Sequence, residues 1–324
     1  MFATQLLSSN IVYRVVLVAV IVVAVLTLAS LFGHHVYLEL ATHFRLQYTL
    51  LSVAAILLLI NFQSWKLLPV AVCCALLNSL YILPYYSRDV VPGSAQQDTR
   101  LRLMQANLLG SNTNYDAIRG SIASALPDIL VLQELTEGCW NQLADLKTEF
   151  PYVKAAPRPG GSGMALLSRF PLEAAEVLAM DQSTHIALWV RVNVQGTPVS
   201  ILALHPPTPV RPDKFNNRNQ QFARAAALLK STNGVRILIG DLNTTMWSPY
   251  FADLIRESGL HDVRKGFGLN CSWPLPLPSF LQIPIDHCLV SGEVVVAGVT
   301  TGKRTGSDHR PLIVSIRFGK AATG

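Results

Sequence analysis

The sequence predicts an α/β domain in which two sheets pack together with helices outside them, preceded by an α-helical membrane anchor. The 324-residue chain is 50% hydrophobic but only 14% charged, whereas soluble domains carry about 25% charged residues. The hydrophobic excess lies in residues 1–86, and short strand-like segments with few helical ones follow from residue 101. Many short strands with few intervening helices favour two packed sheets over one parallel sheet.

Residues 1–86 contain three apolar runs, Ile11–Phe32, Leu46–Phe62 and Trp65–Tyr86. A helix needs about 20 apolar residues to cross a bilayer, so these runs predict a multi-pass anchor of about three helices. A cleaved signal peptide is the alternative for the first run, but that run is long for such a segment and two further runs follow it. Because only residues 61–64 separate the second and third cores, a re-entrant pair is the alternative there.

Three spans would place the N-terminus and the rest of the chain on opposite sides of the membrane. Arg14 and Lys66 would lie on one side, and Arg45 and Arg88 on the other. The positive-inside rule therefore does not distinguish the two orientations. Counting the arginines beyond residue 99 argues slightly against an N-terminus on the inside. With the N-terminus inside, we predict that the downstream domain is extracytoplasmic.

The polar residues 87–100, which include Pro, Gly and Ser, predict a linker, and residues 101–320 predict a globular domain. Apolar segments such as Leu101–Leu109 and Asp128–Leu135 are typical of buried strands, and Phe215–Lys230 has the spacing of an amphipathic helix. Further strands are predicted over 163–169, 186–194, 199–205, 235–242, 285–291, 294–300 and 312–318, and further helices over 115–126, 137–150 and 250–258.

Charge and cysteine content narrow the function only slightly. The net charge of +6 suits an anionic partner such as a phosphate ester, a nucleic acid or an acidic lipid surface, although solubility alone would also account for it. The five cysteines show no CxxC spacing, so they indicate neither a zinc site nor a disulfide framework.

Polar residues that can bind metal recur at the ends of the apolar strands. Asn107 ends the first strand, Glu134 the second, and Asp241 and Asn243 follow ILIG. Capping or turn roles are the alternatives, but carboxylates at the mouth of a β-core are costly unless they bind something or bind each other. Collected at one sheet edge, they would form an oxygen-rich Mg²⁺ site. The same pattern includes Gln133, His205, Asp286, Asp308 and His309.

The motifs VLQE, IGDLN, IDH and SDHRPL occur in the order of the endonuclease/exonuclease/phosphatase family, with GSGMALLSR at the expected place. Over Leu101–Phe318 the chain resembles that family, in its membrane-anchored bacterial form. The resemblance implies a four-layer α/β/β/α sandwich, hydrolysis of phosphate ester bonds, and a requirement for Mg²⁺ or Mn²⁺.

The resemblance also implies roles for individual residues. Glu134 matches the principal metal ligand, with Asn107 and Asp308 beside the metal. Asp241 matches the residue that orients or deprotonates the attacking water, and His309 matches the essential histidine. The other implied roles are those of Asp286, which orients that histidine, Asn243, which holds a phosphate oxygen, and His205, which contacts the phosphate or the leaving group.

Two positions depart from the family pattern. Ala203 stands where many relatives have Asn two residues before the histidine, and Leu109 stands where nucleases often carry a second acidic residue. These departures weaken a two-metal nuclease interpretation. Arg211 and Arg218 are candidates to hold substrate phosphate, with simple solvation as the alternative, and Trp273 is a candidate for the lip of the site.

The sequence therefore predicts a membrane-anchored phosphoesterase that acts on a lipid-linked or membrane-proximal phosphate. A nuclease of the same fold is one alternative, but it would need long basic tracts along a phosphate backbone, and none is found. A non-catalytic membrane scaffold is another, and the intact set of Glu134, Asp241 and His309 argues against it.

Overall fold

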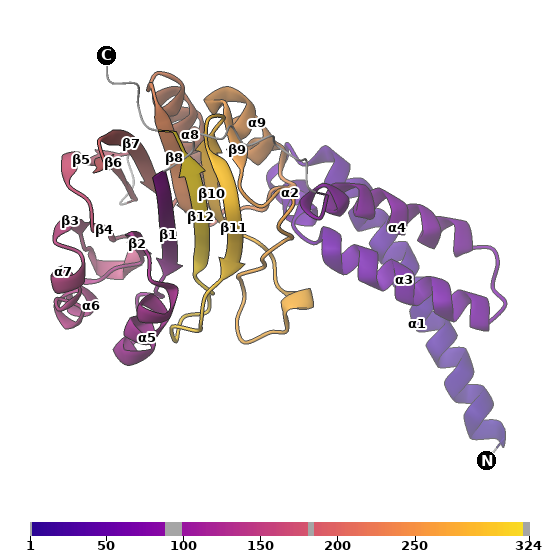
Figure 1. The fold of residues 1–324 in the computed structure, drawn as a ribbon. Helices are drawn as coiled ribbons and strands as arrows, with labels where there is room; N and C mark the ends of the chain where they lie inside the picture. The colour runs from indigo at the N-terminus through magenta and orange to yellow at the C-terminus, as the bar shows by residue number, and fades with distance from the viewer. Residues whose placement is uncertain (1, 88–98, 181–184, 320–324) are drawn as a thin grey trace.

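The computed structural model describes residues 2–87, 99–180 and 185–319. Two facing sheets with helices on their outer sides form one body, which we call the sandwich, and a bundle of N-terminal helices projects from it (Figure 1). Two packed sheets with outer helices were predicted from the sequence, and this prediction is confirmed.

The first sheet has six strands, of which only β1 and β2 run parallel to each other. The parallel pair lies in the middle of the sheet, so the ends of both strands open at the same edge. In sheet order the strands are β11 (Val295–Thr301), β12 (Leu312–Phe318), β1 (Thr99–Asn107), β2 (Ile129–Gln133), β4 (Met164–Ser168) and β3 (Tyr152–Ala156).

The second sheet also has six strands, and β7 and β8 are its parallel pair. A long helix connects these two strands, as a parallel crossover requires. In sheet order the strands are β5 (Leu172–Ala179), β6 (Ile186–Val194), β7 (Thr197–Leu204), β8 (Val235–Asp241), β10 (Asp286–Ser291) and β9 (Leu260–Asp262).

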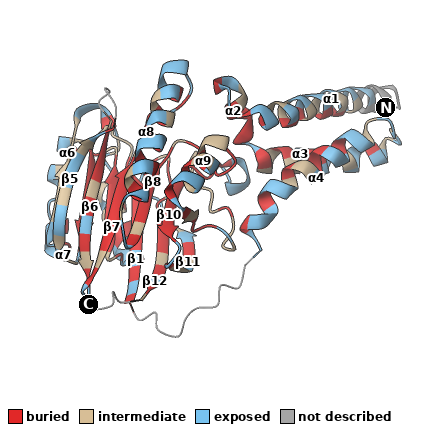
Figure 2. Ribbon diagram, turned by 90° about the horizontal axis from the view of Figure 1, so that it is seen from above, coloured by how far each residue is buried: buried red, intermediate tan, exposed pale blue. Residues whose placement is uncertain are grey.

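Three apolar layers hold the sandwich together: one between the sheets, one under the helices of the first sheet and one under those of the second. The central strands are buried on both faces, as Figure 2 shows, which explains why they appear as continuous apolar runs. The helices are α5 (Tyr115–Ala125), α6 (Glu137–Gln142) and α7 (Leu146–Glu149) on the first sheet, and α8 (Pro212–Lys230) and α9 (Pro249–Ser258) on the second, with short 3₁₀ turns η3 (Pro159–Gly161) and η4 (Ser279–Leu281).

The structure differs from the prediction at the periphery of the sheets. The predicted helix over 137–150 is two short helices, α6 and α7. Three of the four edge strands, β3, β5 and β9, were not predicted; β5, for example, contains only exposed and intermediate residues. Edge strands bury at most one face, so they lack the apolar runs that reveal central strands.

Helices α1 (Phe2–Ala29), α3 (Arg45–Asn61) and α4 (Leu68–Ile82) pack against one another to form the helical bundle, with α2 (Val36–Thr42) and the 3₁₀ turns η1 (Ser30–Phe32) and η2 (Leu83–Tyr85) at its end near the sandwich. The start of α1 and the turn between α3 and α4 lie at the far end in both views (Figures 1 and 2). The bundle therefore has one end facing the sandwich and one facing away.

Asn10–Phe32 and Leu68–Tyr85 are long and apolar enough to cross a membrane, which confirms the first and third predicted runs. The second run is α3, which qualifies only together with α2, bent from it by 61°. The outer surface of the bundle exposes leucines such as Leu57 and Leu80, whereas its interior combines apolar side chains with the buried polar residues Arg45 and Asn78. Arg45 Nη1 donates to Asn78 Oδ1 at 3.0 Å, and Asn78 Nδ2 donates to Thr27 Oγ1 at 2.9 Å, so these buried polar residues pair with one another.

The bundle also contacts the sandwich directly. Most of the predicted linker, residues 88–98, lies outside the described residues. On its N-terminal side, however, the carbonyl of Tyr85 accepts from the Gly268 N–H at 2.7 Å, and the carbonyl of Tyr81 accepts from Trp247 Nε1 at 3.0 Å. Tyr85 also belongs to the apolar layer outside the second sheet. The linker is therefore not the only connection between the two bodies.

Candidate active site

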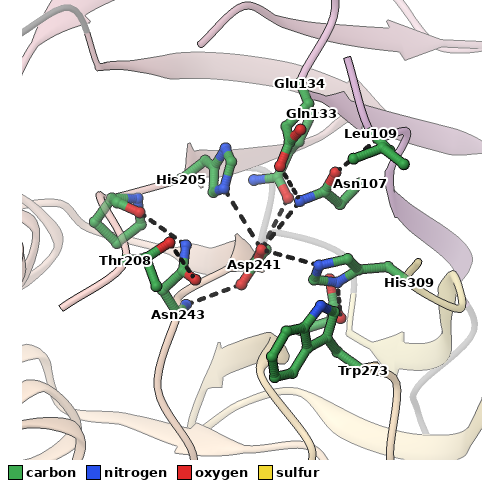
Figure 3. A network of polar contacts seen from close by, with 12 residues as sticks. Asn107, Leu109, Gln133, Glu134, His205, Thr208, Asp241, Asn243, Trp273 and His309 are labelled. Carbon is green, nitrogen blue, oxygen red and sulfur yellow. Dashed lines mark hydrogen bonds and ion pairs between the residues drawn. The ribbon is translucent and has the colours of Figure 1, made fainter. Parts of the chain in front are cut away.

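The candidate active site lies where the parallel strands of the two sheets end. Asn107 is the last residue of β1 and Asp241 the last of β8. Both continue the inward-facing row of their strand, because side chains two residues apart share a face, and Leu103 and Ile239 in those rows belong to the core between the sheets. The polar cluster therefore forms at the edge of that core (Figure 3).

Asn107 holds two carboxylates close together. Its amide nitrogen donates to Glu134 Oε1 at 2.9 Å and to Asp241 Oδ2 at 3.1 Å. Its amide oxygen accepts from the Leu109 N–H at 3.0 Å, and the Gly110 N–H donates to Glu134 Oε2 at 3.1 Å. Asn107 thus lies beside the predicted metal ligand Glu134 and orients it.

Three residues next to the site have left-handed backbone conformations: Leu109 (φ 60°), Glu134 (φ 56°) and Asn243 (φ 50°). Non-glycine residues rarely adopt this region, and each such conformation costs on the order of 1–3 kcal/mol. All three follow closely on the ends of β1, β2 and β8. A cluster of strained residues at one sheet edge is typical of a functional site.

His309 lies between two buried carboxylates. Its Nδ1 is 2.9 Å from Asp286 Oδ2, and its Nε2 is 3.7 Å from Asp241 Oδ2. Burial lowers the pKa of His309, but the negative charges of Asp286 and Asp241 outweigh burial and raise that pKa to about 10. Burial acts to raise the pKa of Asp241, but the charge of His309 and the hydrogen bond and charge of His205 together outweigh burial and lower that pKa. The three residues are thus coupled as one charged unit.

Asn243 and His205 flank Asp241 on its other side. The Asn243 N–H donates to Asp241 Oδ1 at 2.9 Å, and the Asn243 side chain contacts Thr208 Oγ1 at 3.1 Å. His205 Nε2 is 3.5 Å from Asp241 Oδ2. Burial opposes a charged His205, but Asp241 raises its pKa above the ordinary value. The structure therefore brings both predicted residues to Asp241.

Two buried glutamines connect the sheets beneath this cluster. Gln105 Nε2 donates to Gln133 Oε1 at 2.7 Å and to Asp286 Oδ1 at 2.9 Å, and Gln133 Oε1 also accepts from the Asp241 N–H at 2.8 Å. Gln133 was predicted only as one of the polar residues at the strand ends, and Gln105 was not predicted. A polar residue two positions before Asn107, in an otherwise apolar strand, was the available signal.

The cluster opens into a cavity of about 600 Å³, within the roughly 300–1,000 Å³ range of ligand sites. Glu134, Asp308 and His309 lie in its wall together with loop residues 160–162 and 206–210. The wall also includes Leu40, His43 and Phe44, which belong to the helical bundle. Sequence analysis did not predict that the bundle contributes to the site.

The oxygen donors fit the predicted divalent cation. Glu134 and Asp308 both line the cavity, each carboxylate oxygen can accept more than one bond, and Mg²⁺ and Mn²⁺ prefer such ligands. Ligand atoms of Asp241, Asp286 and His309 also lie within 4.8 Å of one another. Asp286 and His309 bond to each other, whereas within the described part of the chain the Glu134 and Asp308 carboxylates accept only from neutral N–H and O–H groups.

The structure places the three predicted substrate-contacting residues differently. Trp273 lines the cavity, and its Nε1 donates to Asp308 Oδ2 at 3.0 Å. Arg211 is not among the residues that line the cavity and pairs with Asp213 on the surface at 3.1 Å. Arg218 is fully buried and pairs with Glu39 of the helical bundle at 2.6 Å. Because it is buried and paired, Arg218 is unavailable to substrate phosphate, and the prediction for this residue is wrong. The local sequence could not reveal the pair, because Glu39 lies far away in the chain.

The family model described as "Endonuclease/Exonuclease/phosphatase family" matches residues 104–309. The chain belongs to this family. The match spans the strand ends that carry Asn107, Glu134, Asp241 and His309, and it confirms the predicted family. It also confirms the prediction of a hydrolase acting on phosphate ester bonds.

Solved structures of the family share the fold. TDP2 from D. rerio, in complex with a single-strand DNA product, is 16% identical with a TM-score of 0.58, covering 68% of this chain and 99% of that one. An endonuclease/exonuclease/phosphatase family protein from Bacteroides thetaiotaomicron is 19% identical with a TM-score of 0.57, covering 68% and 98%. Sphingomyelinase C from Streptomyces griseocarneus is 18% identical with a TM-score of 0.51, covering 67% and 99%. No curated protein matches this chain.

Proposed function

We propose that this chain is a membrane-anchored phosphoesterase that uses Mg²⁺ or Mn²⁺ to hydrolyse a lipid-linked or membrane-proximal phosphate ester. The proposal divides the chain into an anchor (1–86), a linker (87–100) and a catalytic domain (101–320). One observation carries it: Asp241 and His309 face the same cavity as Leu40 and Phe44 of the bundle. The bundle, which contains two helices apolar enough to span a membrane, thus contributes to the wall of the site.

A divalent cation held by Glu134 and Asp308 would neutralise phosphate charge that otherwise repels the attacking water. Asp241 is placed to orient that water and to accept its proton, because Asn107 and the Asn243 N–H fix both of its carboxylate oxygens. His309 presents Nε2 near Asp241 while Asp286 holds Nδ1, so it is placed to stabilise charge on the phosphate.

Asn243 and His205 complete the proposed set around the substrate. The Asn243 side chain donates to the carbonyl of Pro206 and accepts from Thr208 Oγ1, which leaves one amide N–H that would donate to a phosphate oxygen. His205 Nδ1 is buried without a hydrogen-bond partner among the described residues, and a buried unpaired nitrogen is costly. A phosphate or leaving-group oxygen would satisfy it, which agrees with the role that the family resemblance implies.

Activity is expected to depend on a divalent cation. The full chain, solubilised in detergent, is assayed against lipid phosphates, soluble phosphodiesters and DNA with Mg²⁺ and with excess EDTA. We expect EDTA to abolish hydrolysis and added Mg²⁺ or Mn²⁺ to restore it, because the cavity's donors are oxygens suited to these ions. Full turnover in EDTA contradicts the metal assignment, and turnover of DNA without release from lipid phosphates favours the nuclease alternative.

The catalytic domain is expected on the extracytoplasmic side. Counting the bent pair α2–α3 as one span gives three spans, so with the N-terminus inside, the sandwich lies outside. Cysteine accessibility is measured in intact cells, with Thr232→Cys on the sandwich and Gln63→Cys at the far end of the bundle. Labelling of the first and protection of the second is the expected result. The opposite pattern places the catalytic domain in the cytoplasm.

A further inference from the structure

Helix α2 (Val36–Thr42) and the turn after it form part of the active-site wall. Glu39 and His43 lie four residues apart, and so do Leu40 and Phe44, so each pair occupies one side of this segment. Glu39 and His43 face the sandwich, where His43 Nδ1 lies 3.0 Å from Thr245 Oγ1. Leu40 and Phe44 line the catalytic cavity.

Buried polar contacts fix this segment on the sandwich. Arg218 Nη2 of α8 donates to Glu39 Oε1 at 2.8 Å and to Oε2 at 2.6 Å, and Ser248 also donates to Glu39. Neither Glu39 nor Arg218 has exposed side-chain surface. A fully buried ion pair breaks only at considerable cost, so α2 is a fixed part of the site.

A second, open cavity on the helical bundle shares Leu40 and Phe44 with the catalytic cavity. It measures about 360 Å³ and is lined by Leu26 of α1, Tyr48 of α3, and Tyr37, Ala41 and Gln47, besides the two shared residues. We call it the bundle groove. Its lining is mainly apolar. Leu26 lies in a candidate membrane span, and the other lining residues belong to the segment of α2 and α3, which counts as a span only as a bent pair.

We propose that the bundle groove is a subsite for one hydrocarbon chain of a membrane lipid phosphate whose phosphate group lies in the catalytic cavity. The inference rests on the proposed function and specifies its substrate class. The groove shares Leu40 and Phe44 with the catalytic cavity, so a chain and its phosphate can occupy the two spaces at once. An apolar space beside an anion-binding site fits an amphiphile.

His43 lies in the wall of the catalytic cavity, next in sequence to Phe44, which the two spaces share. It is buried, and its Nε2 has no hydrogen-bond partner among the described residues. With Nδ1 accepting from Thr245 Oγ1, a neutral imidazole carries its proton on Nε2. That N–H is then a donor for the polar linkage between the hydrocarbon chain and the phosphate.

The test compares alkyl p-nitrophenyl phosphates with ethyl and octyl chains, using the detergent-solubilised full chain with Mg²⁺. Each methylene moved from water into an apolar site is worth about fourfold in binding, so the wild type is expected to favour the octyl ester in kcat/KM. Leu26→Trp fills the groove from the side away from the catalytic cavity. It is expected to lower the octyl-to-ethyl ratio at least about tenfold. Leu57→Trp, on the exposed face of α3, is the matched control and keeps the wild-type ratio.

A second measurement does not depend on a variant. A lipid phosphate with a diazirine in its hydrocarbon chain is photo-crosslinked to the wild-type chain, and adducts are mapped by mass spectrometry. Adducts are expected within residues 26–48. Adducts confined to other segments, or hydrolysis with an octyl-to-ethyl ratio that Leu26→Trp leaves unchanged, overturn the subsite and leave the hydrolase. If no ester is hydrolysed with any divalent cation, the proposed function fails, and the subsite fails with it.

Discussion

Glu134→Gln, Asp241→Asn and His309→Ala are each expected to remove nearly all turnover without unfolding the sandwich. Glu134→Gln removes a charge from the candidate cation site, and Asp241→Asn removes the proton acceptor that Asn107 and Asn243 hold in place. His309→Ala removes the group between Asp241 and Asp286. Loss of a positioned acid or base typically costs roughly 10²–10⁴-fold, and we expect kcat/KM to fall at least this far.

The controls match each change in chemistry but lie away from the cavity. Glu149→Gln and Asp253→Asn alter carboxylates that form surface ion pairs with Arg169 and Arg256, and His261→Ala alters a histidine of β9. All three are expected to keep near-wild-type kcat/KM. Thermal melting of every variant separates lost chemistry from lost folding. If any of the three site variants keeps a near-wild-type rate with a normal melting curve, the role proposed for that residue is wrong.

The central strands and the residues at their ends could be predicted because local pattern determines both. A strand buried on two faces must be apolar along its length, so a polar residue at its end is conspicuous. Asn107, Glu134 and Asp241 were found in this way, and the structure brings them within hydrogen-bond distance of one another through Asn107. The ordered motifs then allowed the family to be named.

The contacts that complete the site depend on tertiary packing and could not be predicted in the same way. Arg218 and Glu39 are 179 residues apart, and each occurs in a helix where a charged residue usually faces solvent. Nothing in the local pattern indicates that the two meet. The contribution of Leu40 and Phe44 to the cavity could not be predicted for the same reason. This contribution depends on how the bundle docks on the sandwich and not on the composition of the bundle.

The ion pair between Glu39 and Arg218 is expected to be a large contributor to the docking of the bundle. Both side chains are fully buried, and the guanidinium also packs against the rings of Phe215, Phe222 and Tyr250. Removing one partner of a buried pair leaves an uncompensated charge and costs about 3–5 kcal/mol. Glu39→Gln is therefore expected to lower the melting midpoint of the full chain by about 6–20 °C, taking roughly 2–4 °C per kcal/mol for a chain of this size.

The double variant Glu39→Leu/Arg218→Met tests whether the loss of stability in Glu39→Gln comes from the unpaired charge of Arg218 or from altered packing. Apolar replacements of a buried ion pair are often neutral in stability, so the double variant is expected to melt closer to the wild type than Glu39→Gln does. Asp116→Asn, which removes a fully exposed partner of Arg119, serves as the control and is expected to leave the midpoint unchanged. If Glu39→Gln melts like the wild type, the helical bundle does not dock on the sandwich through this pair. The wall formed by Leu40 and Phe44 then loses its support, because Glu39 is the residue that holds α2 against α8.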